Sequence, residues 1–437
     1  MWLRVILVCF VLSHTVSAYA VPSTSIPDTP AGRVLRGWLD AVNDGGQEKL
    51  ETFVDTFWPN GNVGDLALPS YKAGGFDLLG VDRSERLQIV ATLRSKSDRG
   101  EFVIHIDVRE EDTPLIVHLR VFAVPASPKY KAEEVKLDAA ERDHVIDGAV
   151  RLLDEFYVYP EIARKMEVEV RTRQQSHAYD DIFDPNEFAE KLTEDLHRVS
   201  ADKHLGVGFQ YEKLPMDVPE GHAPDDKRFR GQMAIAHCGF EKVEHLPSNI
   251  GYVKFNIFVD PAICGPTATE TMNSIADSDA IIIDLRENSG GHPKMVAFMA
   301  SYLFAERTHL NDLYNRRENS TEEYWTQPDV PGKKFINKPV FVLTSARTFS
   351  GAEEFSYDLK NLKRATLVGE TTAGGAHPTW THRIDDHFYI AVPFARAINP
   401  ITKTDWEGKG VEPDVKVPAE NALDDARKMA VQRDQRR

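Results

Sequence analysis

The sequence predicts a mixed α/β protein in which a core of buried strands and helices follows a separate α+β region. Two observations predict this class. Late in the chain, continuous apolar runs such as residues 280–285 alternate with helix-like segments, as in a sheet that is covered on both faces. Early in the chain, short segments alternate between apolar and polar residues, as strands with one solvated face do. We therefore expect two structural regions of different character.

Residues 1–20 have the pattern of a secretory signal peptide. Arg4 precedes the apolar run VILVCFVL, and small residues end at Ala20, where a signal peptidase would cut; a cut after Ala18 is the competing possibility. The run is too short for a membrane-spanning helix, which disfavours an uncleaved anchor. The sequence therefore predicts export to the periplasm or the exterior, with no membrane span after signal removal.

Residues 21–125 predict a separate α+β domain with a curved sheet. Two short helical segments flank a Gly-Gly pair, and the segments FDLLGV, RLQIVATL, EFVIHIDV and LIVHLRVFAV follow with a period of two. Helices followed by a meander of strands are typical of an α+β domain. The pattern resembles the curved-sheet domains of the nuclear-transport-factor type. It contains no constellation of catalytic residues.

After a polar linker, residues 137–212 predict a helical subdomain. Its last helix is the best marked, because Asp184 can cap it and Pro185 suits its first turn. Four apolar residues then form one stripe along this helix: Phe188, Leu192, Leu196 and Val199. We expect this stripe to pack into a core.

Residues 213–420 predict the α/β core. Its first part is polar and rich in proline, and from about residue 250 the chain alternates strands and helices. Three buried strands are indicated by the runs AIIIDL, PVFVLT and RATLVGE. The first strand leads through RENSGGHP to a helix, and the second leads through SARTFS to another helix.

The turns after these strands hold the candidate catalytic groups. Backbone donors converge where a buried strand gives way to a helix. Gly290 and Gly291 lack side chains, so their N–H groups can approach a substrate oxygen, and Gly351 offers the same beside Ser350. A serine hydroxyl with such donors has the parts of an acyl-transfer site. Ser350 and Glu353 also match a helix capping box, so this structural interpretation stays open.

A serine hydroxyl is a weak nucleophile and requires a base. His204, where the chain turns into a strand, and Glu407, in a turn-rich segment, are the candidates. Taken singly, each is more simply a surface polar residue. For Asp284 and Arg286 we expect a structural ion pair, and for Lys409 a solvated position in a turn.

Charge and cysteine content exclude other classes. The formal net charge is -16, which disfavours a general nucleic-acid binder. No cysteine and histidine cluster has the spacing of metal ligands, so we expect neither a metal nor another cofactor. Cys238 and Cys264 could pair in an oxidising compartment or stay as two buried thiols, and their spacing leaves both possibilities open.

Four motifs carry a family resemblance: DLRENSGG, TSARTFSGAEEF, LVGETTAGGAHP and WEGKGVEPDV. Their order and spacing resemble those of the tail-specific (C-terminal processing) serine peptidase family. Upstream segments look like the subgroup of interphotoreceptor retinoid-binding protein modules and the tricorn core, and the resemblance covers about residues 137–417. It implies a crotonase-like spiral of ββα units for residues 213–420 and hydrolysis of peptide or protein substrates.

The resemblance also implies roles for single residues. Ser350 takes the place of the nucleophile, with Gly351 and either Gly290 or Gly291 holding the oxyanion. Many members use a lysine where this chain has Gly375, so a Ser–Lys dyad is excluded. The tricorn-like members imply a histidine base and a glutamate instead, and these roles fall on His204 and Glu407.

One resemblance supports an alternative function. Retinoid-binding modules bind apolar ligands, and the aromatic segment DEFYVYP could line such a pocket, so a non-catalytic binding module is the alternative. Two details depart from the family pattern. Lys203 stands where the tricorn pattern has a serine, and the stretch from residue 211 to 249 is too short for a PDZ domain. The sequence does not indicate an oligomeric state.

Overall fold

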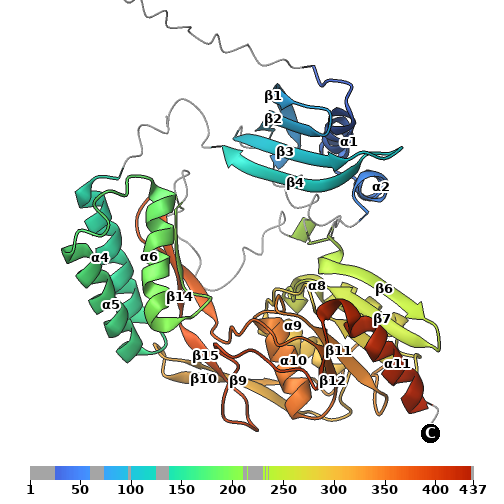
Figure 1. Ribbon diagram of the computed structural model, residues 1–437. Helices are drawn as coiled ribbons and strands as arrows, with labels where there is room; N and C mark the ends of the chain where they lie inside the picture. The colour runs from blue at the N-terminus through green and yellow to red at the C-terminus, as the bar shows by residue number, and fades with distance from the viewer. Residues whose placement is uncertain are drawn as a thin grey trace, which may run out of the picture.

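The computed structural model describes residues 25–59, 73–96, 100–124, 137–209 and 236–434, together with residues 214, 230, 231, 233 and 234. The predicted signal segment, residues 1–20, lies outside the described residues. Among the helices that are described, none is long and apolar enough to cross a membrane. The mixed α/β class that the sequence predicts is confirmed, and Figure 1 shows a β-sheet region near the N-terminus, a group of helices and a central sheet with helices on its faces.

The N-terminal region consists of two helices and an antiparallel sheet. The helices are α1 (Pro30–Asp44) and α2 (Gln47–Phe57). The four-stranded sheet has the order β1-β2-β3-β4, with β1 (Phe76–Ser84), β2 (Gln88–Ser95), β3 (Glu101–Arg109) and β4 (Leu115–Val124). The period of two predicts these strands because every second side chain packs toward the helices, where Trp38 contacts Phe76.

Three helices form the next region: α4 (Ala139–Phe156), α5 (Pro160–Gln175) and α6 (Pro185–Ser200). As predicted, Asp184 caps α6 by accepting the N–H groups of Asn186 and Glu187. The helices share a core with the sheet β13-β14-β5, which comprises β13 (Thr379–Arg383), β14 (Phe388–Pro393) and β5 (Gly206–Phe209). This lobe therefore draws on both of the predicted ranges 137–212 and 213–420.

The core contains a six-stranded sheet of order β16-β12-β11-β8-β7-β6. Five strands are parallel, namely β7 (Ile250–Phe255), β8 (Ala280–Asp284), β11 (Val340–Thr344), β12 (Thr366–Gly369) and β16 (Val415–Lys416). The edge strand β6 (Phe240–Leu246) is antiparallel. Every residue of β8 and β11 is buried, as their continuous apolar runs predict.

Helices cover both faces of this sheet (Figure 1). One face packs against α8 (Pro261–Ser274), α9 (Pro293–Ser301) and α10 (Gly351–Asn361). The other packs against α11 (Ala422–Asp434). Cys238 and Cys264 form a disulfide that ties the turn just before β6 to α8, which decides between the two possibilities that the sequence left open.

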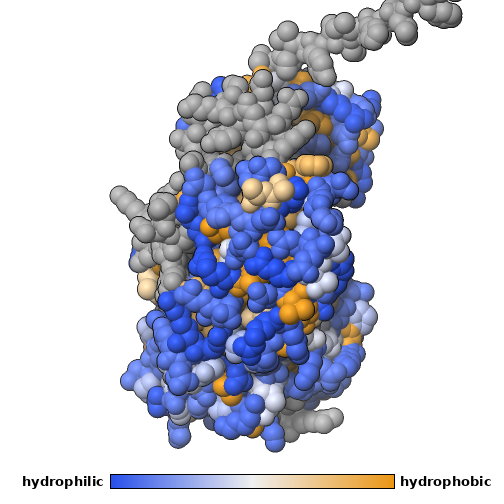
Figure 2. Space-filling view, turned by 90° about the vertical axis from the view of Figure 1, so that its left-hand side faces the viewer, coloured by the Kyte–Doolittle hydropathy of each residue, from blue (hydrophilic) through white to orange (hydrophobic). Residues whose placement is uncertain are grey.

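A third sheet of order β10-β9-β15 contributes β9 (His309–Asn315), β10 (Ser320–Trp325) and β15 (Ala395–Ile398). Beyond β9, Arg316 donates to the carbonyl oxygens of Asp154 and Tyr157 in the helical lobe. On the face shown in Figure 2, small apolar areas lie among a mostly hydrophilic surface.

Candidate active site

Ser350 lies in the sharp turn between β11 and α10. Its backbone has φ 52° and ψ -121°, a left-handed conformation that residues with a side chain rarely adopt. Two hydrogen bonds fix the turn: the N–H of Phe349 donates to the carbonyl of Asn288, and the N–H of Ser350 donates to Glu353. Backbone strain of this kind concentrates at functional sites, and a strained strand-to-helix turn is how several hydrolases expose a nucleophile.

His204 reaches Ser350 from the other lobe. It lies between α6 and β5, and its Nε2 is 3.1 Å from Oγ of Ser350, although 146 residues separate the two in the chain. Its ring stacks on Phe349 with centroids 4.5 Å apart. Burial lowers the pKa of His204 to about 4, an effect that Asp202 opposes and His377 reinforces. The imidazole is therefore neutral near pH 7 and can accept a proton.

The glycine N–H groups beside Ser350 are not equivalent. The N–H of Gly290 donates to Oδ1 of Asn288 at 2.8 Å and is therefore occupied. Within the part of the chain that the structure describes, neither Gly291 nor Gly351 has an acceptor for its N–H. The two lie close together, since a Cβ on Gly351 would be 3.1 Å from the nitrogen of Gly291. Gly291 and Gly351 thus offer the free donor pair that an oxyanion needs.

Glu353 stabilises the turn that carries Ser350. Its buried carboxylate accepts the N–H of Ser350 at 2.8 Å, and burial raises the pKa of the group. It also accepts from the Thr372 hydroxyl at 2.5 Å and from the N–H groups of Gly374 and Gly375 at 2.6 and 2.8 Å. The capping box was the only sequence signal for this residue. It did not indicate that the same carboxylate binds segment 372–375 to the serine turn.

Gly375 stands at the position for which the family resemblance implies a lysine in many members. A Cβ there would lie 2.2 Å from the Phe349 ring and 2.7 Å from Cε1 of His204, so a side chain at this position requires these rings to shift. The imidazole of His204 and the ring on which it stacks occupy the available space. A larger side chain at residue 375 and the observed placement of His204 therefore conflict in this structure.

Glu407 is not hydrogen-bonded to His204. Its Oε2 accepts the N–H of Ala376 at 2.5 Å and lies 3.5 Å from Nδ1 of His377. Among the described residues, Oε1 of Glu407 and Nδ1 of His204 are both buried without a hydrogen-bond partner. Burial, followed by the charge of Asp202, raises the pKa of Glu407 to about 7. A direct role of Glu407 in orienting His204 stays a prediction.

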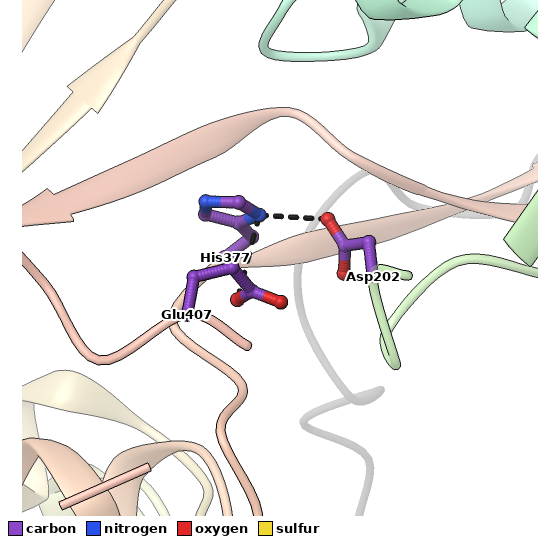
Figure 3. Close-up of side chains that lie close together, drawn as sticks. All are labelled: Asp202, His377 and Glu407. Atoms are coloured by element: carbon purple, nitrogen blue, oxygen red, sulfur yellow. Dashed lines mark hydrogen bonds and ion pairs between the residues drawn. The ribbon is translucent and has the colours of Figure 1, made fainter. Parts of the chain in front are cut away.

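Figure 3 shows instead a cluster of Asp202, His377 and Glu407, which we call the His377 cluster. Nδ1 of His377 is 2.7 Å from Oδ2 of Asp202. Burial favours the neutral form of His377, but the hydrogen bond and charge of Asp202 outweigh it and raise the pKa. Burial opposes ionisation of Asp202 too, yet His377 holds its pKa below the ordinary value.

The His377 cluster was missed by the sequence analysis, although His377 lies inside the motif LVGETTAGGAHP and Asp202 lies two residues before His204. The ligand atoms of its three residues lie within 4.8 Å of one another, so they are the residues that could hold a metal. The 2.7 Å spacing of Nδ1 and Oδ2 is, however, that of a direct hydrogen bond. The arrangement fits a buried ion pair without an added ion.

The other residues that were named from the sequence lie in an ion pair, on the surface or between two loops. Arg286 pairs with the buried Asp284 at 2.6 Å, which confirms the predicted ion pair. Lys409 is exposed, as expected for a solvated turn. Lys203 stands where the tricorn pattern has a serine, so the chain has no serine hydroxyl at this position. Its Nζ donates to the carbonyl of Ala373 at 2.6 Å and connects two loops.

Two family models match the chain. Residues 249–417 match Peptidase family S41, and residues 130–230 match the N-terminal domain of Peptidase_S41 in eukaryotic IRBP. The chloroplastic carboxyl-terminal-processing peptidase 2 of Arabidopsis thaliana is 29% identical over 180 residues, which are 39% of this chain and 32% of the relative. The carboxyl-terminal-processing protease of Synechocystis sp. is 27% identical over 226 residues, 51% of this chain and 50% of the relative. The chain thus spans a third to a half of the length of these relatives.

Two solved structures align with part of this chain at low similarity. The tricorn protease has 13% identity and a TM-score of 0.44 over 83% of this chain and 47% of its own. The photosystem II D1 C-terminal processing protease has 14% identity and a TM-score of 0.41 over 65% of this chain and 94% of its own.

The two family matches extend over most of the chain from residue 130 to residue 417 and include the serine turn and its histidine. The chain belongs to peptidase family S41 and carries the N-terminal domain of the IRBP type.

Proposed function

We propose that this protein is a serine peptidase that hydrolyses peptide bonds through an acyl-enzyme, with Ser350 as nucleophile and His204 as general base. One observation carries the proposal: Nε2 of His204 lies 3.1 Å from Oγ of Ser350, in a chain of peptidase family S41. This distance is within the range over which a base can take the proton of a hydroxyl. Peptides or proteins are the proposed substrates.

In the first step Oγ of Ser350 attacks the peptide carbonyl carbon while Nε2 of His204 takes the hydroxyl proton. The tetrahedral intermediate then collapses, the C–N bond breaks, and the imidazolium returns the proton to the leaving amine. In the second step water attacks the ester carbonyl, with His204 again as base. The C–O bond to Oγ breaks, the serine regains its proton and the new carboxylate leaves.

The oxyanion is assigned to the N–H groups of Gly291 and Gly351. Gly290 is left out because Asn288 already accepts its N–H. Hydrogen-bond donors aimed at the developing charge stabilise the transition state strongly, and loss of one typically adds about 2.7–4 kcal/mol to the barrier. The positive end of α10 points to the same place and adds to this stabilisation.

The proposal includes export and the crotonase-like form of the core. The disulfide between Cys238 and Cys264 supports export to the periplasm or the exterior, because such bonds persist in oxidising compartments. The repeat of buried strand, turn and helix at β8–α9 and β11–α10 supports the crotonase-like arrangement. Among the described residues we find no comparable observation for the apolar-ligand alternative, since Phe156 and Tyr157 are packed in the core of the helical lobe.

A serine-reactive fluorophosphonate tests the proposal. We expect it to label the purified protein, and we expect Ser350→Ala to abolish labelling without changing the thermal unfolding midpoint by more than a few degrees. Ser345→Ala is a matched control, because Ser345 lies in the same loop but bonds the carbonyl of Arg286. Labelling that persists in Ser350→Ala, or a folded wild type that is never labelled, would reject Ser350 as the nucleophile.

A further inference from the structure

We propose that Asp202 and His377 position the general base: Asp202 holds the segment that carries His204, and His377, flanked by Glu407, holds Asp202. This inference rests on the proposed function, because it assigns what orients the base of that reaction. It assigns no contact with substrate to either residue, so both are positioning residues.

Asp202 connects three segments that are far apart in the chain. Its Oδ1 accepts the backbone N–H of His204 at 3.1 Å. Its Oδ2 accepts from the Tyr157 hydroxyl at 3.3 Å and from Nδ1 of His377 at 2.7 Å. The residue is 1% exposed, so these bonds are not weakened by competition with bulk water. Movement of Asp202 would therefore move the backbone at the base.

His377 donates a hydrogen bond to this buried carboxylate and, when protonated, also provides a positive charge beside it. It is 3% exposed, and its Nδ1 lies 2.7 Å from Asp202 and 3.5 Å from Glu407. A buried carboxylate is costly unless it is paired and hydrogen-bonded. One imidazolium between two carboxylates meets this requirement for Asp202 and in part for Glu407. The other titratable or charged groups that face the cluster are Tyr157, Tyr159, His204, Arg396 and Asp405.

The geometry of His204 explains why such support is needed. In a Ser-His-Asp triad, a carboxylate accepts the Nδ1–H of the histidine and fixes its ring. Here Nδ1 of His204 has no partner in the described part of the chain. The ring is held by stacking on Phe349 and by the backbone bond to Asp202. Orientation therefore comes through the main chain, and the His377 cluster is the structure that fixes it.

Kinetics with matched variants test the inference. Asp195→Asn is the control for Asp202→Asn, because Asp195 is equally buried and accepts a tyrosine hydroxyl, that of Tyr179, at 2.9 Å without contacting His204. We expect Asp202→Asn to lower kcat about 10²-fold, as a displacement of about 1 Å does, with KM changed by less than about threefold. Asp195→Asn is expected to change the unfolding midpoint but not kcat.

Variants of His377 separate its hydrogen bond from its bulk. In His377→Asn the side-chain amide can still donate to Asp202 from near the position of Nδ1, whereas His377→Leu cannot. We expect His377→Asn to retain at least about tenfold more kcat than His377→Leu, a difference of roughly one hydrogen bond to a charged group. Equal loss in both variants would count against the donor role of His377.

A measurement without turnover keeps this inference separate from the proposed function. In the Ser350→Ala protein, the Cε1–H signal of His204, assigned by its loss in His204→Gln, is followed by NMR between pH 3 and 8. We expect Asp202→Asn to shift this signal and to lower the pKa of His204 further, because a neighbouring negative charge is lost, whereas Asp195→Asn should leave both unchanged. If the His204 signal and pKa are the same in Asp202→Asn and in the control, the positioning role is refuted whether or not the protein is a peptidase.

Discussion

The substitution Gly375→Ala tests the placement of the base most directly. The backbone of Gly375 is not in the left-handed region, so an added methyl group affects the folded site through steric contacts and not through backbone strain. That methyl would lie 2.2 Å from the Phe349 ring and 2.7 Å from Cε1 of His204. Because an ordinary carbon–carbon contact is about 3.5 Å, the imidazole must retreat by about 0.8 Å.

This displacement converts into a measurable loss of rate. A shift of about 1 Å at a catalytic group costs on the order of 10²-fold, or about 2.7 kcal/mol in the barrier. We therefore expect Gly375→Ala to lower kcat/KM by about 10²-fold, while overpacking lowers the free energy of unfolding by about 1–3 kcal/mol. The assay is hydrolysis of a fluorogenic peptide or, without a known substrate, the second-order rate of fluorophosphonate labelling.

Gly206→Ala is the matched control for this substitution. Gly206 lies two residues after His204, and a Cβ there would meet nothing closer than Thr193 at 3.8 Å. It should therefore retain activity within about twofold. A Gly375→Ala protein that reacts as fast as the wild type would refute the reasoning, because the imidazole would then not occupy the space beside residue 375.

Further predictions concern pH and the disulfide. The pKa of His204 is about 4 and that of Glu407 is about 7, so we expect kcat/KM to fall in two steps as the pH is lowered. Glu407→Gln should remove only the upper step. A single step near pH 6.5 in both proteins would contradict this expectation. Burial raises the pKa of Glu354 to about 8. The contribution of the uncharged carboxyl group to the free energy of unfolding is therefore complete below about pH 4.5. It is lost at about 1.4 kcal/mol per pH unit as the pH rises toward 8. Urea unfolding of Glu354→Gln at pH 5 and pH 8 should show a smaller pH dependence than the wild type, and an unchanged dependence would exclude Glu354 as its source. Replacing both Cys238 and Cys264 by serine removes a cross-link between residues with a sequence separation of 26. In urea titrations this should lower the free energy of unfolding by roughly 3–4 kcal/mol, because the unfolded chain regains the entropy of the open loop. No change would contradict this loop-entropy argument.

The local structure of the chain was predictable where neighbouring residues determine it. Asp184 and Pro185 predict the start of α6 because a cap depends only on residues within one turn. The apolar run of β8 predicts a buried strand because burial on both faces favours apolar side chains, and the one polar residue of β8, Asp284, is paired with Arg286. The turn that carries Ser350 follows from the same pattern, since a strand must end before a helix can begin.

The contacts between distant segments were not predictable. Periodicity finds β13 and β14 as strands at best, but it does not reveal that they complete the helical lobe with β5. The sequence does not distinguish the N–H groups of Gly290 and Gly291. In the structure the side chain of Asn288 accepts the N–H of Gly290 and leaves that of Gly291 available. Likewise, nothing near His377 in sequence indicates Asp202 as its partner, because that contact joins residues 175 positions apart.

Burial has two opposite effects on the proposed base. It lowers the pKa of His204 and so keeps the imidazole neutral and ready to accept the serine proton. The same burial makes the imidazolium costly once the proton has arrived, at the moment when the transition state needs it. Negative charge nearby offsets this cost, and the structure provides it in Asp202, whose charge already raises the basicity of His204. A base with no carboxylate on its Nδ1 can therefore still be stabilised in its charged form, provided that the His377 cluster keeps Asp202 ionised and in place.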